Sequence, residues 1–238
     1  MTHDKNKKTK DSIRINKYLA DQGITTRRGA DKLISVGKVL INGKRAKLGD
    51  VVNEGDDVSL KGVKEEKLVY YAYNKPVGVT TVGKQEGEEE IKDIIQFPFR
   101  VFPLGRLDKD SSGLLIVTND GRITKKLLDG KYNHEKEYVV EVNKPIEHNF
   151  MVRLRDGVSL GRETTKKAKV RKLDKYTFEI ILTEGKNRQI RRMCASFNYD
   201  VRALERIRIM NIELGKIASN TYREIKGKEL EDFLKKVL

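Results

Sequence analysis

The sequence predicts an α+β protein, with a small N-terminal module followed by a domain built on a mixed, mostly antiparallel sheet flanked by helices. Residues 12–61 read as a helix pair followed by short apolar strands. From residue 68 onward, runs rich in Val, Ile, Leu and Tyr are separated by turns containing Gly, Asp or Asn. These segments show no regular strand–helix–strand alternation, which argues against a doubly wound sheet.

In the N-terminal module, the first helix is expected over 13–22 and ends at Gly23. Thr25 or Thr26 caps a second helix that runs to Val36. The helix faces predicted to be buried carry Ile15, Leu19, Ala20, Ala30, Leu33 and Ile34. Short strands over 39–41, 51–52 and 58–60 follow, and Asn42-Gly43 forms a hairpin turn.

The larger domain is expected to begin at residue 68 and to run to residue 238, after a charged linker at 62–67. Its strands are predicted over 68–73, 101–104, 114–118, 138–142, 167–173, 177–182, 201–209 and 211–214. Its helices are predicted over 91–95, 189–197 and 229–237. Residues 1–11 are rich in lysine and are interpreted as a disordered basic tail.

The composition favours a nucleic-acid partner. Fifty Lys and Arg against thirty-five Asp and Glu give a formal net charge of +15. The single cysteine, Cys194, excludes an intramolecular disulfide and is expected to be a buried structural thiol in a cytoplasmic protein. With three histidines, it cannot form a typical zinc cluster. We expect no metal, no cofactor and no membrane span.

Basic residues are concentrated in the N-terminal module. Between Arg14 and Lys47 there are nine Lys or Arg and only two acids. Arg27 and Arg28 occupy the first turn of the second helix, where the helix dipole disfavours cations, so a phosphate is their expected partner. The alternative is that both are simply solvated surface arginines. The expected RNA contacts are Arg14, Lys17, Arg27, Arg28, Lys38 and Lys44.

Three segments of this module carry a resemblance. They are Arg14-Ile15-Asn16-Lys17-Tyr18-Leu19, then Arg27-Arg28-Gly29-Ala30-Asp31, then Val39-Leu40-Ile41-Asn42-Gly43-Lys44. Together they resemble the S4 domain, a helix-pair module that many RNA-binding proteins use to grip structured RNA. The resemblance implies RNA binding by residues 12–61.

Asp108 lies in the segment Gly105–Leu115, and three interpretations of it are open. The residues Asp-Lys-Asp-Ser-Ser-Gly are good turn formers, so Asp108 is adequately explained as a turn residue. A calcium loop is disfavoured, because Asn119 replaces the glutamate at the twelfth position. A catalytic carboxylate gains support from the basic block at 187–193, which can supply cationic partners.

The motifs of the larger domain resemble the pseudouridine synthases, in the branch that contains RsuA, RluB, RluE and RluF. They are Lys75-Pro76-Val77-Gly78, the segment 105–121, His134-Glu135-Lys136-Glu137-Tyr138, the segment 187–193 and Leu204-Glu205-Arg206-Ile207-Arg208-Ile209. They occur in the family's order, behind an S4 module as in that branch. The segments 102–111 and 208–211 look closest to the RluF subgroup.

The resemblance implies a role for each matching residue. Asp108 corresponds to the family's essential aspartate, Tyr138 to the tyrosine that stacks on the target base, and Arg191 to the basic partner of the aspartate. Leu204 corresponds to the apolar residue beneath the base, and Arg106 to the arginine that holds the flipped nucleotide's place. Further substrate contacts are expected from Lys75, Arg188 and Arg192.

The implied reaction is the isomerisation of a specific uridine to pseudouridine, which needs no redox step. The implied substrate is ribosomal RNA, with 23S rRNA favoured, and the protein is expected to act as a monomer. The same chemistry on 16S rRNA or tRNA is one alternative. A non-catalytic RNA-binding factor in ribosome assembly is another, and it would require a disabled site.

Overall fold

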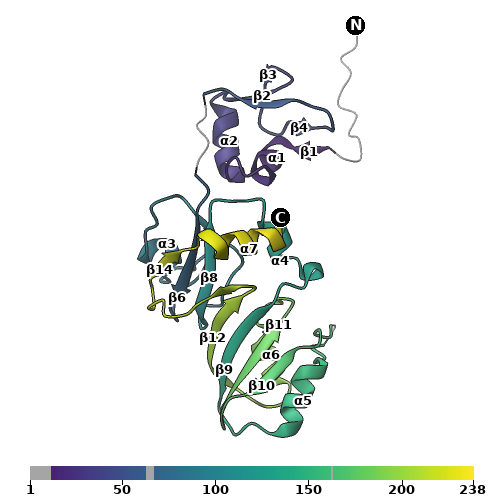
Figure 1. The fold of residues 1–238 in the computed structure, drawn as a ribbon, viewed down its shortest axis with the longest axis vertical. Coiled ribbons are helices and arrows are strands. Elements are labelled where there is room, and N and C mark those ends of the chain that lie inside the picture. Colours follow the sequence, from purple (N-terminus) through teal and green to yellow (C-terminus); the bar gives the residue numbers. More distant parts are fainter. Residues whose placement is uncertain (1–11, 63–66, 162) are drawn as a thin grey trace. The chain divides into compact units, whose positions relative to one another are not determined.

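The computed structural model describes residues 12–62, 67–161 and 163–238. The predicted basic tail and residues 63–66 of the predicted linker lie outside these ranges. The described residues divide into two compact units. One extends to Leu68 and takes in Asn119–Arg122, and the other contains the remainder of the chain (Figure 1).

The first unit is a helix pair with two small sheets. Its elements are β1 (Ile13–Arg14), α1 (Ile15–Asp21), α2 (Arg27–Ser35), β2 (Val39–Ile41), β3 (Lys44–Arg45), β4 (Val51–Val52) and β5 (Val58–Leu60). Strand β1 pairs with β4, and β2 lies between β3 and β5. Both helices and the strands that follow them start within a residue or two of the positions predicted from the sequence.

Local signals explain the helix pair. The Thr26 side chain accepts a hydrogen bond from the Gly29 amide at 3.1 Å, which is the expected cap of α2. A core of Ile15, Leu19, Ala30, Ile34 and Val39 fills the space between the helices and β2. These residues include most of the predicted inward-facing set, so this unit was largely predictable from apolar periodicity.

The second unit is built on one large sheet. Its strands are β6 (Tyr70–Lys75), β7 (Phe102–Pro103), β8 (Ser112–Thr118), β9 (Lys136–Val142), β10 (Lys169–Lys172), β11 (Thr177–Leu182), β12 (Val201–Ile209), β13 (Ile212–Glu213) and β14 (Tyr222–Glu224). Its helices are α3 (Ile91–Ile94), α4 (Thr124–Leu128), the 3-10 turn η1 (Gly130–Tyr132), α5 (His148–Asp156), α6 (Gln189–Ala195) and α7 (Gly227–Val237).

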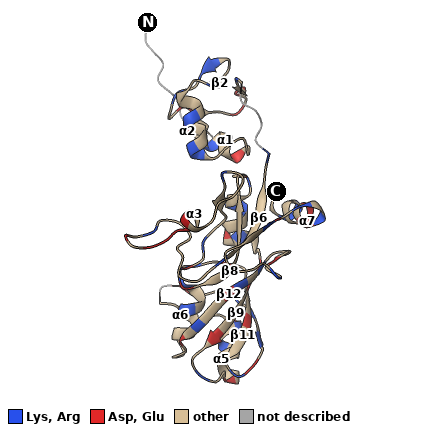
Figure 2. Ribbon diagram, turned by 90° about the vertical axis from the view of Figure 1, so that its left-hand side faces the viewer, with Lys and Arg blue, Asp and Glu red and all other residues tan. Residues whose placement is uncertain are grey.

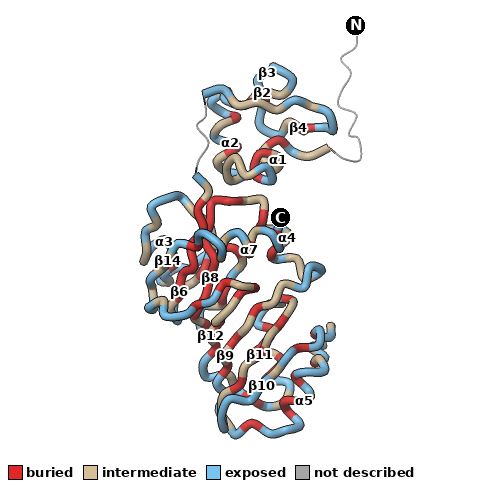
Figure 3. Tube along the Cα trace, viewed as in Figure 1, coloured by how far each residue is buried: buried red, intermediate tan, exposed pale blue. Residues whose placement is uncertain are grey.

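The order across the sheet is β10-β11-β9-β12-β8-β6-β14, with β13 paired to β12 and β7 paired to β8. The β12–β8 pair is parallel, and the other pairs along this path are antiparallel. This confirms the predicted mixed, mostly antiparallel sheet. Central strands β6 and β8 are largely buried, as Figure 3 shows in red, whereas buried and less buried residues alternate along β9.

Two apolar clusters stabilise the sheet. One includes Val140, Phe150, Phe178 and Met193 and joins α5 and α6 to β9 and β11. The other includes Tyr73 and Leu115 on β6 and β8. Cys194 is fully buried in the first cluster, and burial raises the pKa of its thiol to about 12. This confirms the expected structural thiol.

Within the described part of the chain, every helix is too short or too polar to cross a membrane.

Candidate active site

The loop between β7 and β8 presents Asp108. The turn closes with a hydrogen bond from the Ser111 amide to the Asp108 carbonyl at 3.1 Å. The side chain of Asp108 is about one-third exposed (31%), so it faces a space that solvent can enter. Strand β8 begins at Ser112, directly after the turn, which fixes one end of the loop on the central sheet.

Hydrogen bonds from a second loop hold Asp108 in place. The Thr81 hydroxyl donates a hydrogen bond to the Leu107 carbonyl at 2.6 Å. The same hydroxyl oxygen accepts a hydrogen bond from the Leu107 amide at 3.1 Å. The Gly78 amide donates to the Lys109 carbonyl at 2.7 Å. The residues on either side of Asp108 are therefore fixed, which limits the movement of its carboxylate.

Arg188 approaches the turn from the start of α6. Its guanidinium donates to both carboxylate oxygens of Asp110, at 3.0 and 2.9 Å, and lies 3.9 Å from Oδ2 of Asp108. The backbone of Arg188 is left-handed, with φ of 46°. Such a conformation costs a non-glycine residue about 1–3 kcal/mol and is concentrated at functional sites.

Arg191 was expected to pair with Asp108, but in the structure it contacts Asp110. Its Nη2 donates to the Asp110 carbonyl at 2.7 Å, and its Nε lies 3.3 Å from the Asp110 carboxylate. Among the described residues, the cation within 4 Å of the Asp108 carboxylate belongs to Arg188. The expected Arg191–Asp108 ion pair is thus replaced by one to Asp110, because Arg191 lies one helical turn further along α6.

The two arginines also govern the charge of Asp110. Partial burial raises the pKa of this carboxyl, but Arg188 and Arg191 outweigh burial and leave the pKa below its ordinary value. Asp110 therefore stays anionic and ties α6 to the loop that carries Asp108.

A cleft of about 870 Å³ opens in front of Asp108. Tyr138 on β9 and Leu204 on β12 line it, with exposed fractions of only 9% and 8%. Arg106 and Arg188 also line it and are exposed. The structure therefore brings together five residues predicted from the sequence: a carboxylate, an aromatic ring, an apolar side chain and two cations.

Lys75, predicted to contact substrate, is fully buried at the end of β6. Its ammonium donates to the carbonyls of Pro76 and Val79 at 2.7 and 2.8 Å. Desolvation lowers its pKa to about 8, while Asp108 and Asp110 oppose that effect. In this structure the lysine shapes the loop that supports Asp108 through these two carbonyl contacts, and its expected contact with substrate stays a prediction.

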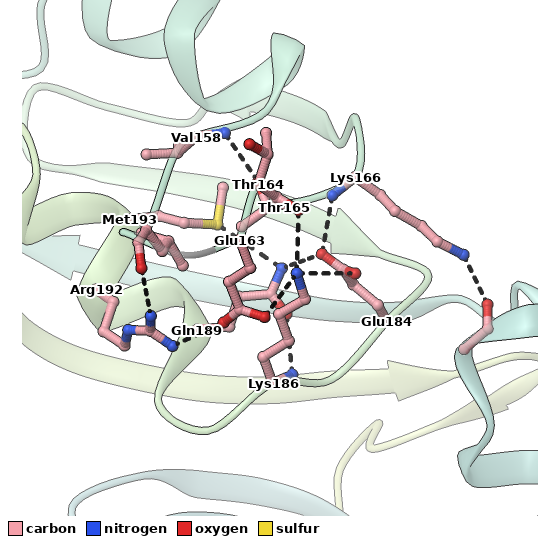
Figure 4. A network of polar contacts seen from close by, with 12 residues as sticks. Val158, Glu163, Thr164, Thr165, Lys166, Glu184, Lys186, Gln189, Arg192 and Met193 are labelled. Atoms are coloured by element: carbon pink, nitrogen blue, oxygen red, sulfur yellow. Dashed lines mark hydrogen bonds and ion pairs between the residues drawn. The ribbon is translucent and has the colours of Figure 1, made fainter.

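Arg192, also predicted to contact substrate, is not one of the described residues that line the cleft. It donates to the Leu160 carbonyl at 3.0 Å and pairs with Glu163 at 3.2 Å (Figure 4). The carboxylate of Glu184 accepts from the Lys166 amide at 2.9 Å and from Gln189 Nε2 at 2.8 Å. This network joins the segment after α5 to the start of α6. Arg192 therefore helps to hold α6, whose first residues line the cleft.

Sequence reasoning missed two residues of the cleft, Lys136 and Arg206. Lys136 lies two positions before Tyr138 on β9, and Arg206 lies two positions after Leu204 on β12. Alternation along a strand places each on the same face as its predicted neighbour. That spacing was visible in the sequence and would have identified both.

The predicted RNA contacts lie on the surface of the first unit. Arg14, Arg27, Arg28, Lys38 and Lys44 are exposed. Lys17 is partly buried and pairs with Asp21 at 3.4 Å. In Figure 2, where Lys and Arg positions are blue on the ribbon, several lie on α2. Their exposure leaves them available to phosphates.

Comparison with known proteins agrees with this geometry. Residues 69–196 match the RNA pseudouridylate synthase family, and residues 13–58 match the S4 domain. The chain is 45% identical to the dual-specificity RNA pseudouridine synthase RluF of Escherichia coli K12, over 94% of this chain and 79% of the relative. It is 34% identical to the ribosomal large subunit pseudouridine synthase B of Bacillus subtilis, over 92% and 94% of the two chains.

A solved structure described as that of a pseudouridylate synthase is 28% identical. It superposes with a TM-score of 0.69 and covers 95% of this chain and all of its own. The family match spans more than half of the chain, and its residues include Asp108, Tyr138 and Arg188. This chain therefore belongs to the RNA pseudouridylate synthase family, with an N-terminal S4 domain, and is a pseudouridine synthase.

Proposed function

We propose that this pseudouridine synthase modifies one or a few uridines of 23S ribosomal RNA, with Asp108 as its catalytic carboxylate. The observation that supports the catalytic role is the position of Asp108, held by hydrogen bonds to its flanking residues at a cleft lined by Tyr138 and Leu204. The name of the Bacillus subtilis relative, which specifies the large ribosomal subunit, supports the choice of RNA.

In the proposed reaction the target uridine leaves the RNA helix and enters the cleft. Flipping a base out of a helix costs a few kcal/mol of stacking and pairing. Stacking on the Tyr138 ring returns about 1–3 kcal/mol of that cost, by analogy with other base–aromatic contacts. Leu204 supports the opposite side of the base, and Arg106, exposed at the rim, takes the place that the base has left.

Asp108 then acts on the ribose. Its carboxylate either attacks C1′ to form an ester or removes the C2′ proton to give a glycal. Either route breaks the N1–C1′ bond, after which the uracil rotates and C5 bonds to C1′. C5 loses its proton and N1 gains one, so substrate and product are isomers. Arg188 and Asp110 serve this step by holding the Asp108 turn against α6.

The S4 domain provides RNA affinity through its basic surface. Arg14, Arg27, Arg28, Lys38 and Lys44 are exposed cations suited to phosphate contacts, and Lys17 joins them by exchanging Asp21 for a phosphate. The words "dual-specificity" in the name of the Escherichia coli relative support a second RNA substrate, and tRNA is the candidate to test.

The test is to incubate the purified protein with 23S rRNA, 16S rRNA and tRNA transcripts and to map pseudouridine in each. We expect new pseudouridine at one or a few positions of 23S rRNA, with any tRNA product at a separate site. Product in 16S rRNA alone would contradict the proposed substrate. An Asp108→Asn protein that still forms product at the wild-type rate would contradict the catalytic role.

A further inference from the structure

Two basic side chains at the cleft, Lys136 and Arg206, are buried without a counter-ion. Their exposed fractions are 8% and 4%, and both line the cleft. Across residues 12–62, 67–161 and 163–238, neither has a carboxylate oxygen within 4.0 Å. Each lies among residues that the proposed function assigns to the base.

The polar atoms of both side chains are incompletely satisfied. Lys136 makes one long hydrogen bond, to the His134 carbonyl at 3.4 Å. Nε of Arg206 donates to the Leu114 carbonyl at 2.7 Å, while its Nη2 is buried and has no hydrogen-bond partner in the described structure. A buried cation without a partner destabilises the fold. Such a cost persists in an enzyme when a substrate supplies the missing charge.

Strand pairing places the two cations beside the expected base. Arg206 lies directly opposite Tyr138 in the β12–β9 register, and Leu204 lies opposite Val140. Residues directly opposite each other point to the same face of a sheet, as do residues two apart on one strand. Lys136, Tyr138, Leu204 and Arg206 therefore share one face.

Burial separates these cations from those that suit phosphates. Arg106 and Arg188 are exposed and line the same cleft, so the RNA backbone can reach them without entering deeply. Lys136 and Arg206 are nearly closed to solvent. The part of a flipped nucleotide that goes deepest is its base, so the anion suited to them is the base.

We propose that Lys136 and Arg206 stabilise the negative charge that uracil acquires when its bond to C1′ breaks. The electron pair of the N1–C1′ bond passes to N1 and is delocalised onto O2 and O4, which face the two cations. When C5 bonds to C1′, the C5 proton is lost and N1 takes up a proton, which restores neutral uracil. The inference rests on the proposed function and concerns only the leaving base.

The test uses Lys136→Met in the full-length protein under single-turnover conditions, with enzyme in excess over RNA. Tritium release from RNA labelled at uracil C5 reports the reaction, and equilibrium binding reports RNA affinity. We expect the rate to fall by about 10²–10³-fold, the effect of removing one preorganised donor to a developing charge. The RNA dissociation constant is expected to change by less than about threefold, because no phosphate contact is lost.

Stability separates this role from a structural one. Replacing an unpaired buried ammonium with an apolar side chain of similar length is expected to leave the unfolding temperature unchanged or to raise it. Higher stability with lower activity is the pattern expected of a residue retained for catalysis. Lys136→Arg and Arg206→Lys keep the charge and are expected to retain at least about tenfold more activity than Lys136→Met and Arg206→Met.

Lys169→Met is the matched control, since Lys169 is an exposed lysine on β10 that pairs with Glu135 at 2.8 Å. It is expected to react at the wild-type rate. Wild-type turnover by Lys136→Met overturns the inference. So does a tenfold loss of RNA affinity with a lower salt slope, which would assign the pair to a phosphodiester. An equal loss of activity in the charge-retaining variants (Lys136→Arg and Arg206→Lys) and in the neutral Met variants also overturns the inference. A wild-type protein that forms no pseudouridine contradicts the proposed function instead.

Discussion

The guanidinium of Arg188 binds both carboxylate oxygens of Asp110, at 3.0 and 2.9 Å, and lies 3.9 Å from the carboxylate of Asp108. One cation therefore joins the start of α6 to the turn that carries the proposed catalytic residue. Both side chains of the Arg188–Asp110 pair are nearly half exposed, so the pair adds little to the stability of the fold. The main effect of this ion pair is to fix the position of the turn that carries Asp108.

Asp110→Asn is expected to lower the single-turnover rate while the protein remains folded. The substitution removes the charge that holds Arg188 and Arg191, and a displacement of about 1 Å at a reacting group costs up to about 10²-fold in rate. Tritium release and thermal unfolding measure the two effects. Asp232→Asn is the control, since Asp232 on α7 pairs with Lys228 far along the chain from the turn. An unchanged rate in Asp110→Asn would show that Arg188 does not position the turn through this carboxylate.

Gly113→Ala is expected to destabilise the larger unit. A Cβ at Gly113 would lie 2.4 Å from the Arg206 carbonyl oxygen, where β8 pairs with β12, and the backbone φ is +100°. Clash and strain together predict a loss of more than about 2 kcal/mol of unfolding free energy in chemical denaturation.

Gly215→Ala separates strain from clash, because Gly215 has φ of +55° and open space around its Cβ position. We expect a loss of about 1 kcal/mol there. Equal losses at both glycines would contradict the close approach of β8 and β12.

Arg27→Ala and Arg28→Ala are expected to weaken RNA binding at low salt. Each substitution removes one phosphate contact, so the slope of log affinity against log salt becomes shallower by about 0.7–1. Titrations at several salt concentrations measure this slope. Lys32→Ala removes a charge from the last turn of the same helix and is expected to leave the slope unchanged. If Lys32→Ala makes the slope as shallow as the arginine variants do, the proposed phosphate contacts of Arg27 and Arg28 would be contradicted.

Stability is expected to rise between pH 8 and pH 9. Desolvation lowers the pKa of Lys75 and of Lys136 to about 8, below the value of about 10.4 that lysine has in an unfolded chain. Over this interval the unfolded state binds more protons than the folded state, so the free energy of unfolding increases with pH. The expected gain is on the order of 1 kcal/mol per lysine.

Urea denaturation at the two pH values measures this gain. The window closes near pH 9, where the Cys194 thiol of the unfolded chain is half ionised at its ordinary pKa of 9.0. Burial raises the folded pKa of this thiol to about 12, so a further rise in pH favours unfolding through this group. Lys136→Met is expected to lose its share of the increase. A variant with the full wild-type increase would show that Lys136 does not titrate in this range.

Local signals explain which parts of the fold were predictable. Thr26 caps α2 and the Asn42-Gly43 turn joins β2 to β3, and both act within a few residues. Helix α5 was not predicted, although Phe150, Met151 and Leu154 form its buried face. Its N-cap, Glu147, makes no capping hydrogen bond, so the sequence lacks a start signal there.

The sequence motifs predicted which residue types line the site, but not the contacts that each residue makes. Asp108, Tyr138 and Leu204 meet at one cleft as expected. The partners of Arg191 and Arg192, and the burial of Lys75, depend on the angle at which α6 and the 76–79 loop pack on the sheet. Such contacts join segments far apart in the chain, and residue spacing carries no information about them.

Pseudouridine mapping in cells that lack this protein tests the central claim most directly. The deletion strain would be complemented with either the wild-type protein or the Asp108→Asn variant. Pseudouridine would then be mapped in the 23S rRNA, 16S rRNA and tRNA of every strain. The account predicts that a 23S mark disappears, returns with the wild-type protein and stays absent with Asp108→Asn. A mark restored by Asp108→Asn, or no change in any RNA, would contradict it.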